Sequence, residues 1–385
     1  MAATTLYPRL LTVPKQSFFL FGPRGSGKST WVRSKFPDAH RVDLLDEVTH
    51  HTYLTQVGAF ADELRTLPNG STVIVDEVQR LPQLLNEVHR SIEERRMRFV
   101  LCGSSARKLK QQGTNLLAGR ALRRLMFPLL PAELGRDFDL ETVLTHGSLP
   151  VIWRSEERAE ALLAYVRLYL REEIQIEALV RNLPGFARFL PVAGILHGQT
   201  LNVASLARDA GAPRVTVSGY LDILEDTLLA FRLPAYSAKL RVREKKHPKL
   251  YWIDPGVARA ARQRVGPISQ EERGPLFEGW IACLLQAYRE YRGLFDDWFY
   301  WAPGEAARTE VDFLLQRGRE WVAIEAKSAS RIDDAELRGL RAISNLRGLK
   351  RRILVHPAQR PRITTDGIEL WPVATFLTHL EKGTL

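Results

Sequence analysis

The sequence predicts an α/β protein with two sheet-containing domains and a helical middle part. Three observations support this fold class: short apolar runs alternate with helical segments near the N-terminus, helical periodicity dominates the middle, and two strand-like runs flank a tight turn near the C-terminus. Alternating strands and helices favour a parallel sheet covered by helices. The expected parts span residues 1–130, 131–185, 186–254 and 255–385.

The composition is that of a soluble globular protein. The chain has 385 residues, enough for two to four domains, with 45% hydrophobic and 26% charged residues. No apolar run approaches the roughly 18 residues that span a bilayer, so we expect a cytoplasmic protein without a membrane partner. The separated Cys102 and Cys283 predict neither a disulfide framework nor a zinc site. A net charge of +11 favours an anionic partner, with nucleic acid the first candidate, although such a charge also simply keeps proteins soluble.

The strongest motif follows the apolar run 18–21 and has the spacing Gly-x4-Gly-Lys-Ser. Glycines let backbone N–H groups close around a polyphosphate, Lys28 can reach the β- and γ-phosphates, and the Ser29 hydroxyl can bind Mg²⁺. An ordinary turn is the alternative, but the strand before the motif and the helix after it favour a phosphate-binding loop (P-loop) for ATP. The expected nucleotide-binding residues are Gly22, Pro23, Arg24, Gly25, Ser26, Gly27, Lys28, Ser29 and Thr30.

Strand-like runs follow at 42–45 and 71–75, and the second ends in the adjacent carboxylates Asp76 and Glu77. Asp76 suits a Mg²⁺ ligand that acts through water, and Glu77 suits the base that orients the attacking water during ATP hydrolysis. Two carboxylates can also simply begin a helix, whose dipole favours them there. Their occurrence 48 positions after Lys28, at the end of an apolar run, supports the catalytic role.

The apolar run 98–102 ends in Gly103-Ser104-Ser105, which brings small polar side chains to the carboxyl edge of the sheet, where ligands bind. This run resembles the sensor strand of AAA-type ATPases, which implies a catalytic role for Ser104 or Ser105; a solvated loop is the alternative. In related ATPases an arginine near the following Leu-Ala-Gly-Arg motif contacts the γ-phosphate of its own or a neighbouring subunit. The resemblance therefore implies this role for Arg120 and a possible homo-oligomer, although an ordinary surface arginine also fits.

The middle part contains a helical connector and a helix-turn-helix pattern. The stretch 131–185 has helical periodicity and predicts a connector or lid on the P-loop domain. Helical segments at 202–210 and 214–228 are separated by a Gly-Ala-Pro turn, and strand-like runs follow at 229–233 and 250–253. Two helices joined by such a turn are typical of helix-turn-helix units, and the two strands would complete a winged helix.

Basic residues crowd the stretch between these two strands, which runs from Lys239 to Lys249 and contains one acid, Glu244. A wing with a basic tip would contact DNA phosphates while the second helix faces a groove. Winged helices also bind proteins, and a basic loop is often a solvated turn. The expected DNA-binding residues are Arg214, Thr216, Ser218, Arg243, Lys245 and Lys246.

Carboxylates and a lysine recur in the last part of the chain. Glu278 lies at the edge of an apolar helical stripe, and a predicted hairpin carries Asp312 on one strand and Glu325 and Lys327 on the other. Alternation puts Glu325 and Lys327 on one face, where the hairpin can place Asp312 beside them. Such a set suits metal-dependent phosphodiester cleavage, in which Asp312 and Glu325 bind Mg²⁺ and the lysine stabilises charge. An ion-paired sheet face is the alternative.

The spacing Asp312-x12-Glu325-Ala326-Lys327 resembles the PD-(D/E)XK nuclease core, with Glu278 as the acidic residue of its first helix, although no proline directly precedes Asp312. The whole order of motifs resembles a large family of prokaryotic AAA-type ATPases. Members carry a C-terminal domain of unknown function that looks like a restriction endonuclease. The resemblance covers nearly the full chain. It indicates the domain architecture more than the biological function.

These observations lead to one principal hypothesis and one alternative. The first is a DNA-associated ATPase whose nucleotide state repositions a winged helix and a nuclease-like domain, the latter cutting DNA or only binding it. The alternative is an ATP-switched scaffold or regulator that binds a protein partner and never cuts.

Overall fold

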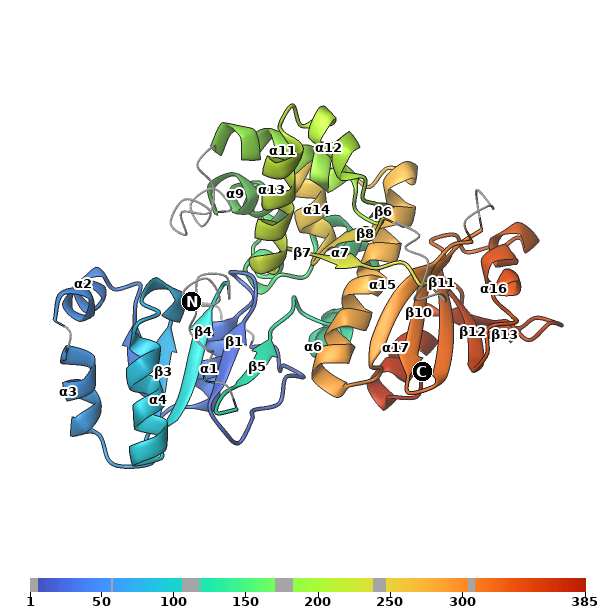
Figure 1. The fold of residues 1–385 in the computed structure, drawn as a ribbon. Coiled ribbons are helices and arrows are strands. Elements are labelled where there is room, and N and C mark those ends of the chain that lie inside the picture. The colour runs from blue at the N-terminus through green and yellow to red at the C-terminus, as the bar shows by residue number, and fades with distance from the viewer. Residues whose placement is uncertain are drawn as a thin grey trace.

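Two sheets lie at opposite ends of the molecule with a helical part between them (Figure 1). The computed structural model describes residues 6–56, 58–105, 117, 119–169, 183–237, 247–303 and 309–385. A third, smaller sheet lies within the middle part. Within these described residues, none of the helices combines the length and apolar character needed to cross a membrane.

The N-terminal sheet is parallel throughout, as the alternating sequence pattern predicts, with strand order β2-β3-β4-β1-β5. Its strands are β1 (Phe18–Phe21), β2 (His40–Asp43), β3 (Thr72–Asp76), β4 (Arg98–Gly103) and β5 (Leu122–Leu125). Helices α1 (Lys28–Lys35), α2 (Glu47–Thr55), α3 (Ala59–Thr66) and α4 (Leu84–Arg95) and the short 3-10 helix η1 (Val78–Arg80) connect them. Because β1, β4 and β3 are neighbours, their carboxyl ends meet at one edge.

Burial and local hydrogen bonds explain how these strands are placed. Phe19 and Phe21 pack into one hydrophobic cluster and Phe18 and Leu20 into another, so β1 is covered on both faces. The strand expected at 42–45 instead spans His40–Asp43. It ends there because the Asp43 carboxylate accepts the Leu45 N–H at 2.9 Å and turns the chain.

The connector consists of short helices, as its periodicity predicts. These are α6 (Pro131–Leu134), η2 (Gly135–Asp137), α7 (Leu140–His146), α8 (Pro150–Trp153), α9 (Arg158–Ala164), the π-helical turn η3 (Tyr165–Tyr169) and α11 (Leu183–Ile195). Leu162 and Val166, from the expected apolar stripe, are buried. Two other members of that stripe, Leu170 and Ile174, lie outside the described residues.

The helix-turn-helix pattern forms two helices against a three-stranded antiparallel sheet. Its elements are β6 (Gln199–Thr200), α12 (Val203–Asp209), α13 (Arg214–Asp226), β7 (Ala230–Leu233) and β8 (Lys249–Trp252), in the sheet order β6-β8-β7. The Asn202 side chain caps α12 by accepting two backbone N–H groups. Helix α13 ends two residues before the expected Leu228, which adopts a left-handed φ of 59°.

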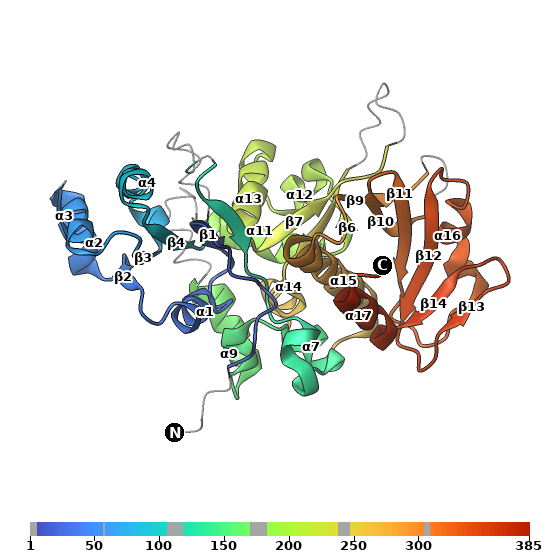
Figure 2. The same cartoon turned by 90° about the horizontal axis from the view of Figure 1, so that it is seen from below.

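The C-terminal part contains a six-stranded mixed sheet in the order β13-β14-β12-β11-β10-β9. Its elements are α14 (Pro255–Ala261), α15 (Gln270–Arg292), β9 (Asp297–Trp301), β10 (Val311–Arg317), β11 (Glu320–Ala326), η4 (Asp334–Leu337), α16 (Arg338–Ala342), β12 (Leu349–His356), β13 (Arg362–Ile363), β14 (Glu369–Pro372) and α17 (Val373–Lys382). The predicted hairpin is confirmed, with Arg317 opposite Glu320 beside its turn. Figure 2 shows α15 and α17 side by side between this sheet and the rest of the molecule.

The small middle sheet continues into the C-terminal sheet. Tyr300 of β9 receives a hydrogen bond from the Tyr236 N–H at 2.7 Å and donates one to the Pro234 carbonyl at 3.0 Å. The Phe231 ring of β7 lies 5.7 Å from the Trp298 ring of β9, measured between ring centroids. These contacts cross the boundary expected between residues 254 and 255, so the strands of the middle part and the last domain share one core.

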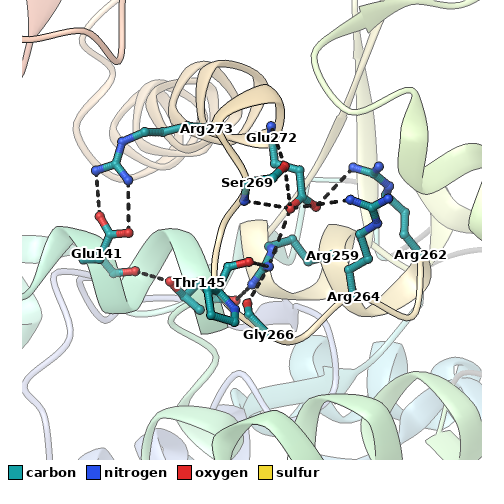
Figure 3. A network of polar contacts seen from close by, with 10 residues as sticks. Glu141, Thr145, Arg259, Arg262, Arg264, Gly266, Ser269, Glu272 and Arg273 are labelled. Carbon is teal, nitrogen blue, oxygen red and sulfur yellow. Dashed lines mark hydrogen bonds and ion pairs between the residues drawn. The ribbon is translucent and has the colours of Figure 1, made fainter.

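A polar joint connects the connector to the start of α15 (Figure 3). Arg273 donates two hydrogen bonds to Glu141 of α7, at 3.0 and 2.7 Å, and Arg259 donates to the Thr145 carbonyl at 2.9 Å. The buried carboxylate of Glu272 is surrounded by three guanidinium groups, those of Arg259, Arg262 and Arg264. The orientation of α15 is thereby fixed relative to α7 and α14.

Helix α15 also passes very close to the middle sheet, and this closeness yields a testable prediction. A Cβ at Gly279 would lie 1.9 Å from Nε2 of His197, whose ring is buried and accepts the Trp252 N–H through Nδ1. We expect Gly279→Ala to lower the free energy of unfolding by about 1–3 kcal/mol through overpacking. Gly274→Ala, on the same helix in open space, is the matched control and should raise stability by about 0.5–1 kcal/mol. Denaturant titrations followed by tryptophan fluorescence measure both; equal effects would contradict the packing argument.

Candidate functional site

The P-loop lies between β1 and α1, where the sequence predicts it. Gly25 and Gly27 adopt left-handed φ values of 71° and 90°, which residues with side chains rarely take. The buried Lys28 ammonium donates to the carbonyls of Gly22 and Pro23, at 2.6 and 3.2 Å. The lysine is therefore folded over the concave side of the loop, where a polyphosphate would bind.

The P-loop serine and the first acidic residue after β3 contact each other directly. The Ser29 hydroxyl donates to Oδ2 of Asp76 at 2.7 Å. A hydroxyl and a carboxylate oxygen are ligands that Mg²⁺ accepts in proteins, one directly and the other commonly through water. The two residues expected to hold this ion are thus adjacent, and the donor set fits it.

Glu77 is held by a residue that the sequence analysis did not identify. The Gln79 amide donates to the Glu77 carboxylate and, at 3.1 Å, to the Ser104 hydroxyl. Gln79 is buried, and a Cβ at Gly103 would lie 2.5 Å from its Oε1, so the glycine makes room for it. Gln79 thus connects the expected base to the expected sensor serine. The only sequence signal was its place two residues after Glu77.

Segments far from the P-loop in sequence brace its backbone. Arg9 donates to the Ser26 carbonyl at 2.8 Å and pairs with the buried Glu133 at 3.1 Å. From the connector, Val151 donates its N–H to Gly25 at 3.3 Å and Tyr165 its hydroxyl to the Arg24 carbonyl at 3.2 Å. The loop is therefore in contact with both the N-terminal segment and the connector.

A cavity of about 240 Å³ borders Gly27 and Thr30, the beginning of α1. Its other walls come from the N-terminal segment, from α1, and from α8 with the residue that follows it, and include Tyr7, Pro8, Trp31, Pro150 and Arg154. The sequence analysis missed these wall residues because no local motif marks them.

Arg120, the expected γ-phosphate contact, forms an ion pair with Glu93 of α4. Both side chains are about half-exposed. Arg120 therefore lies on a surface of this chain, and its role in ATP hydrolysis stays a prediction.

The expected DNA-binding residues fall partly within the described structure. Arg214 is exposed, and Thr216 and Ser218 are partly exposed on α13, while Val217 and Tyr220 of the same helix are buried. The other three, Arg243, Lys245 and Lys246, lie outside the described residues.

In the C-terminal part, the expected acidic set converges. Asp312 and Glu325 are buried at neighbouring strand ends, and the Asp312 N–H donates to Glu325 Oε2 at 3.3 Å. Lys327 pairs with the other oxygen of Glu325. Carboxylate oxygens of Glu278, Glu310 and Asp312 lie within 4.8 Å of one another. Glu310 was not expected here and joins the three expected residues as a fourth carboxylate.

The sequence analysis grouped Lys249 with the basic stretch of the wing, and the structure corrects this. Its side chain is only 3% exposed, and its ammonium lies among the carboxylates, 2.8 Å from Glu278, 3.2 Å from Asp312 and in contact with Glu310. Tyr251, two residues along β8, donates its hydroxyl to Glu278 at 2.6 Å. The alternation of β8 directs both side chains toward α15 and β10.

Burial and mutual repulsion shift the pKa values of these carboxyl groups apart. Burial, followed by the charge of Asp312, raises the pKa of Glu278 to about 7 and raises that of Glu325 well above its usual range. Burial alone would also raise the pKa of Asp312, but the positive charge of Lys249, followed by that of Lys327, holds it below its usual value. Of Glu278, Asp312 and Glu325, Asp312 therefore has the lowest pKa.

A divalent metal ion does not fit this arrangement as it stands. The group expected to carry positive charge between Glu278 and Asp312 is already present as the Lys249 ammonium. We therefore derive no metal-dependent step at Asp312 and Glu325.

Three domain families match successive parts of the chain. Residues 14–135 match the AAA domain, and residues 137–267 and 273–376 each match a domain of unknown function (DUF8612 and DUF4143). Together with the parallel sheet and the P-loop, the first match defines an AAA-type P-loop domain.

The chain is also similar to whole proteins. Uncharacterized proteins of Mycobacterium bovis and Mycobacterium tuberculosis are each 24% identical to it over 368 residues, covering 93% of this chain and 80% of theirs. Among solved structures, the Aeropyrum pernix ORC1 protein in complex with DNA is 13% identical with a TM-score of 0.25, covering 65% of this chain and 87% of that one. The replication initiator DnaA bound to AMPPCP and single-stranded DNA is 12% identical with a TM-score of 0.27, covering 55% and 82%. A Vibrio cholerae protein is 14% identical with a TM-score of 0.22 and covers 96% of both chains.

Because the Lys249 ammonium is buried among carboxylates, removing it should strongly destabilise the fold. We expect Lys249→Met to lower the free energy of unfolding by about 3–5 kcal/mol, since the carboxylates lose their partner without leaving the interior. The control is Lys350→Met, which breaks an exposed pair with Glu320 and should cost no more than about 1 kcal/mol. Denaturant titration of both variants measures the difference. Similar small losses would mean that the Lys249 cluster contributes little to stability.

Proposed function

We propose that this protein binds and hydrolyses ATP in its AAA-type domain. The observation that carries the proposal is the direct contact between Ser29 and Asp76 beside the folded-over Lys28. Ser29 and Asp76 would hold Mg²⁺, which supplies charge neutralisation to the phosphates when bound. Lys28 would bind the β- and γ-phosphates, and Glu77 would orient the attacking water.

The contacts between the P-loop and the connector suggest how nucleotide binding affects the conformation of the rest of the chain. Phosphate oxygens attract the N–H groups of the loop, and any adjustment there moves carbonyls that Val151 and Tyr165 of the connector contact. The cavity beside Thr30 offers apolar and aromatic walls for the base of the nucleotide. We infer that the nucleotide state controls the position of the connector and of the domains that follow it.

Two substitutions separate ATP binding from hydrolysis. Lys28→Ala should abolish ATP binding because the phosphates lose their main cationic partner. Glu77→Gln should retain ATP binding, because Lys28 and the metal ion still neutralise the phosphates. It should lower kcat at least about 100-fold, because the base that orients the attacking water is lost. Fluorescent-nucleotide titration and phosphate release measure the two effects. Unchanged turnover in both variants would remove the ATPase proposal.

We further infer that the middle part is a DNA-binding winged helix. Its element order, β6, α12, α13, β7 and β8, is the helix-turn-helix and wing order, and Arg214 at the start of α13 is exposed. The chain carries a net charge of +11, and basic residues concentrate between β7 and β8. Contacts from these residues to phosphates would supply sequence-independent affinity.

Salt dependence tests the DNA proposal. Replacing Lys245 and Lys246 together by Ala should weaken duplex binding and reduce the slope of log affinity against log salt by about 2, since each phosphate contact releases a counterion. The matched control replaces Arg317 and Arg319 by Ala, two exposed cations at the turn of the C-terminal hairpin. Fluorescence anisotropy at several salt concentrations gives both slopes. Equal losses in the two variants would indicate non-specific attraction to a basic protein.

A second candidate function is an ATP-switched scaffold that binds a protein partner and cuts nothing. The burial of Lys249 in the acidic set favours a non-cleaving role for the C-terminal domain. The absence of any salt-sensitive DNA affinity would support this function over the first. A homo-oligomer in which Arg120 serves a neighbouring nucleotide is compatible with either.

A further inference from the structure

We propose that Lys249 is the built-in counter-ion of the C-terminal acidic site and closes this site to divalent cations while β8 remains in place. The carboxylates resemble those of a metal-dependent nuclease, yet the cation among them belongs to the chain itself. The proposal concerns the contact between the middle sheet and the C-terminal domain and does not depend on ATP hydrolysis.

Each of the three N–H donors of the Lys249 ammonium has a carboxylate close by. A lysine ammonium has three N–H donors, and three carboxylates surround this one: Glu278 at 2.8 Å, Asp312 at 3.2 Å, and Glu310 in direct contact. The same three residues offer the oxygens that cluster within 4.8 Å of one another. Lys249 thus already makes the contacts that a cation would make at this point.

Every carboxylate oxygen of Asp312 and Glu325, the two residues expected to bind metal, already has a partner within the chain. Asp312 accepts the Ala326 N–H at 2.9 Å through Oδ2, while Lys249 contacts Oδ1. Glu325 accepts the Asp312 N–H through Oε2, while Lys327 contacts Oε1. Mg²⁺ needs near-octahedral oxygen coordination at about 2.0–2.1 Å. An ion bound beside Lys249 and Lys327 would place like charges in contact, so Mg²⁺ binding is favoured here only after one of the two ammonium groups moves away.

The backbone of Lys249 is held by strand pairing on both sides, and its side chain is almost fully buried. It lies on β8, which pairs with β6 on one side, where Thr200 is opposite Lys249, and with β7 on the other, where Leu233 is opposite. The neighbouring Tyr251 is buried and bonded to Glu278. Withdrawing the ammonium therefore requires β8 to shift against α15. The middle sheet thus controls whether the acidic site is accessible to metal.

Binding of Mn²⁺ to the full-length protein without nucleotide tests the proposal, with free Mn²⁺ counted from its paramagnetic resonance signal. The wild type and Asp312→Asn should bind the same amount, because the closed site contributes nothing. Lys249→Met should gain one Mn²⁺ per chain, bound at least tenfold more tightly than any wild-type site. Adding Asp312→Asn to Lys249→Met should remove it.

Two results would overturn the proposal. One is a wild-type Mn²⁺ site that Asp312→Asn abolishes, which would show that metal binds with Lys249 present. The other is a folded Lys249→Met protein, judged by circular dichroism, that gains no site. Lys249→Gln, which keeps a hydrogen-bond donor without the charge, replaces Lys249→Met if the latter fails to fold. If neither Lys249 variant folds, the test is the comparison of Mn²⁺ binding between the wild type and Asp312→Asn. A lower Mn²⁺ content in Asp312→Asn would then overturn the proposal.

Discussion

The burial of one ammonium group among three carboxylates is the constraint on which the arrangement of the middle and C-terminal parts depends. Lys249 comes from the small middle sheet, Glu278 from α15, and Asp312 from the large C-terminal sheet. Charges taken out of water stabilise a fold only when their partners are well placed, so the three elements tolerate little displacement. Aromatic contacts such as that of Tyr251 with Phe313 of β10 continue the same interface as a hydrophobic core.

Beside the P-loop, a second buried pair has a comparable role. Glu133 accepts the backbone N–H groups of Leu10 and Leu130, at 2.7 and 3.0 Å, and pairs with Arg9. Arg9 in turn bonds to the Ser26 carbonyl of the P-loop. The N-terminal segment, the P-loop and the first turn of the connector therefore form one polar unit. A shift of the P-loop backbone on phosphate binding would act on the connector through these direct contacts.

Residues close together in sequence were predictable, and residues brought together by long-range packing were not. The P-loop, the Asp76 and Glu77 pair, and the hairpin carrying Asp312 and Glu325 depend on local spacing, which the sequence displays directly. Nothing local places Arg9 against the P-loop. Such contacts arise from the tertiary arrangement. The tertiary arrangement also decides whether a side chain is buried or exposed, whatever the composition of the residues next to it in sequence.

Lys249 is the clearest case of this effect. Its neighbours in sequence are basic and predict a solvated wing, while its place on β8 directs it into the interior. Gln79 escaped detection for a related reason, since its two partners, Glu77 and Ser104, come from different strands of the parallel sheet. Boundary errors, as at β2 and α13, reflect single hydrogen bonds or backbone angles that periodicity does not encode.

The wall that Tyr7 and Pro8 contribute to the cavity beside Thr30 has a practical consequence. Any polypeptide joined ahead of Leu6 starts next to the space proposed for the nucleotide base, and could compete with it or bury it further. Helix α17, by contrast, packs on the C-terminal sheet and on α6 and ends at Lys382. No residue of α17 lines this cavity, so of the two ends of the chain the N-terminal one is where an added segment would start beside the space proposed for the nucleotide base.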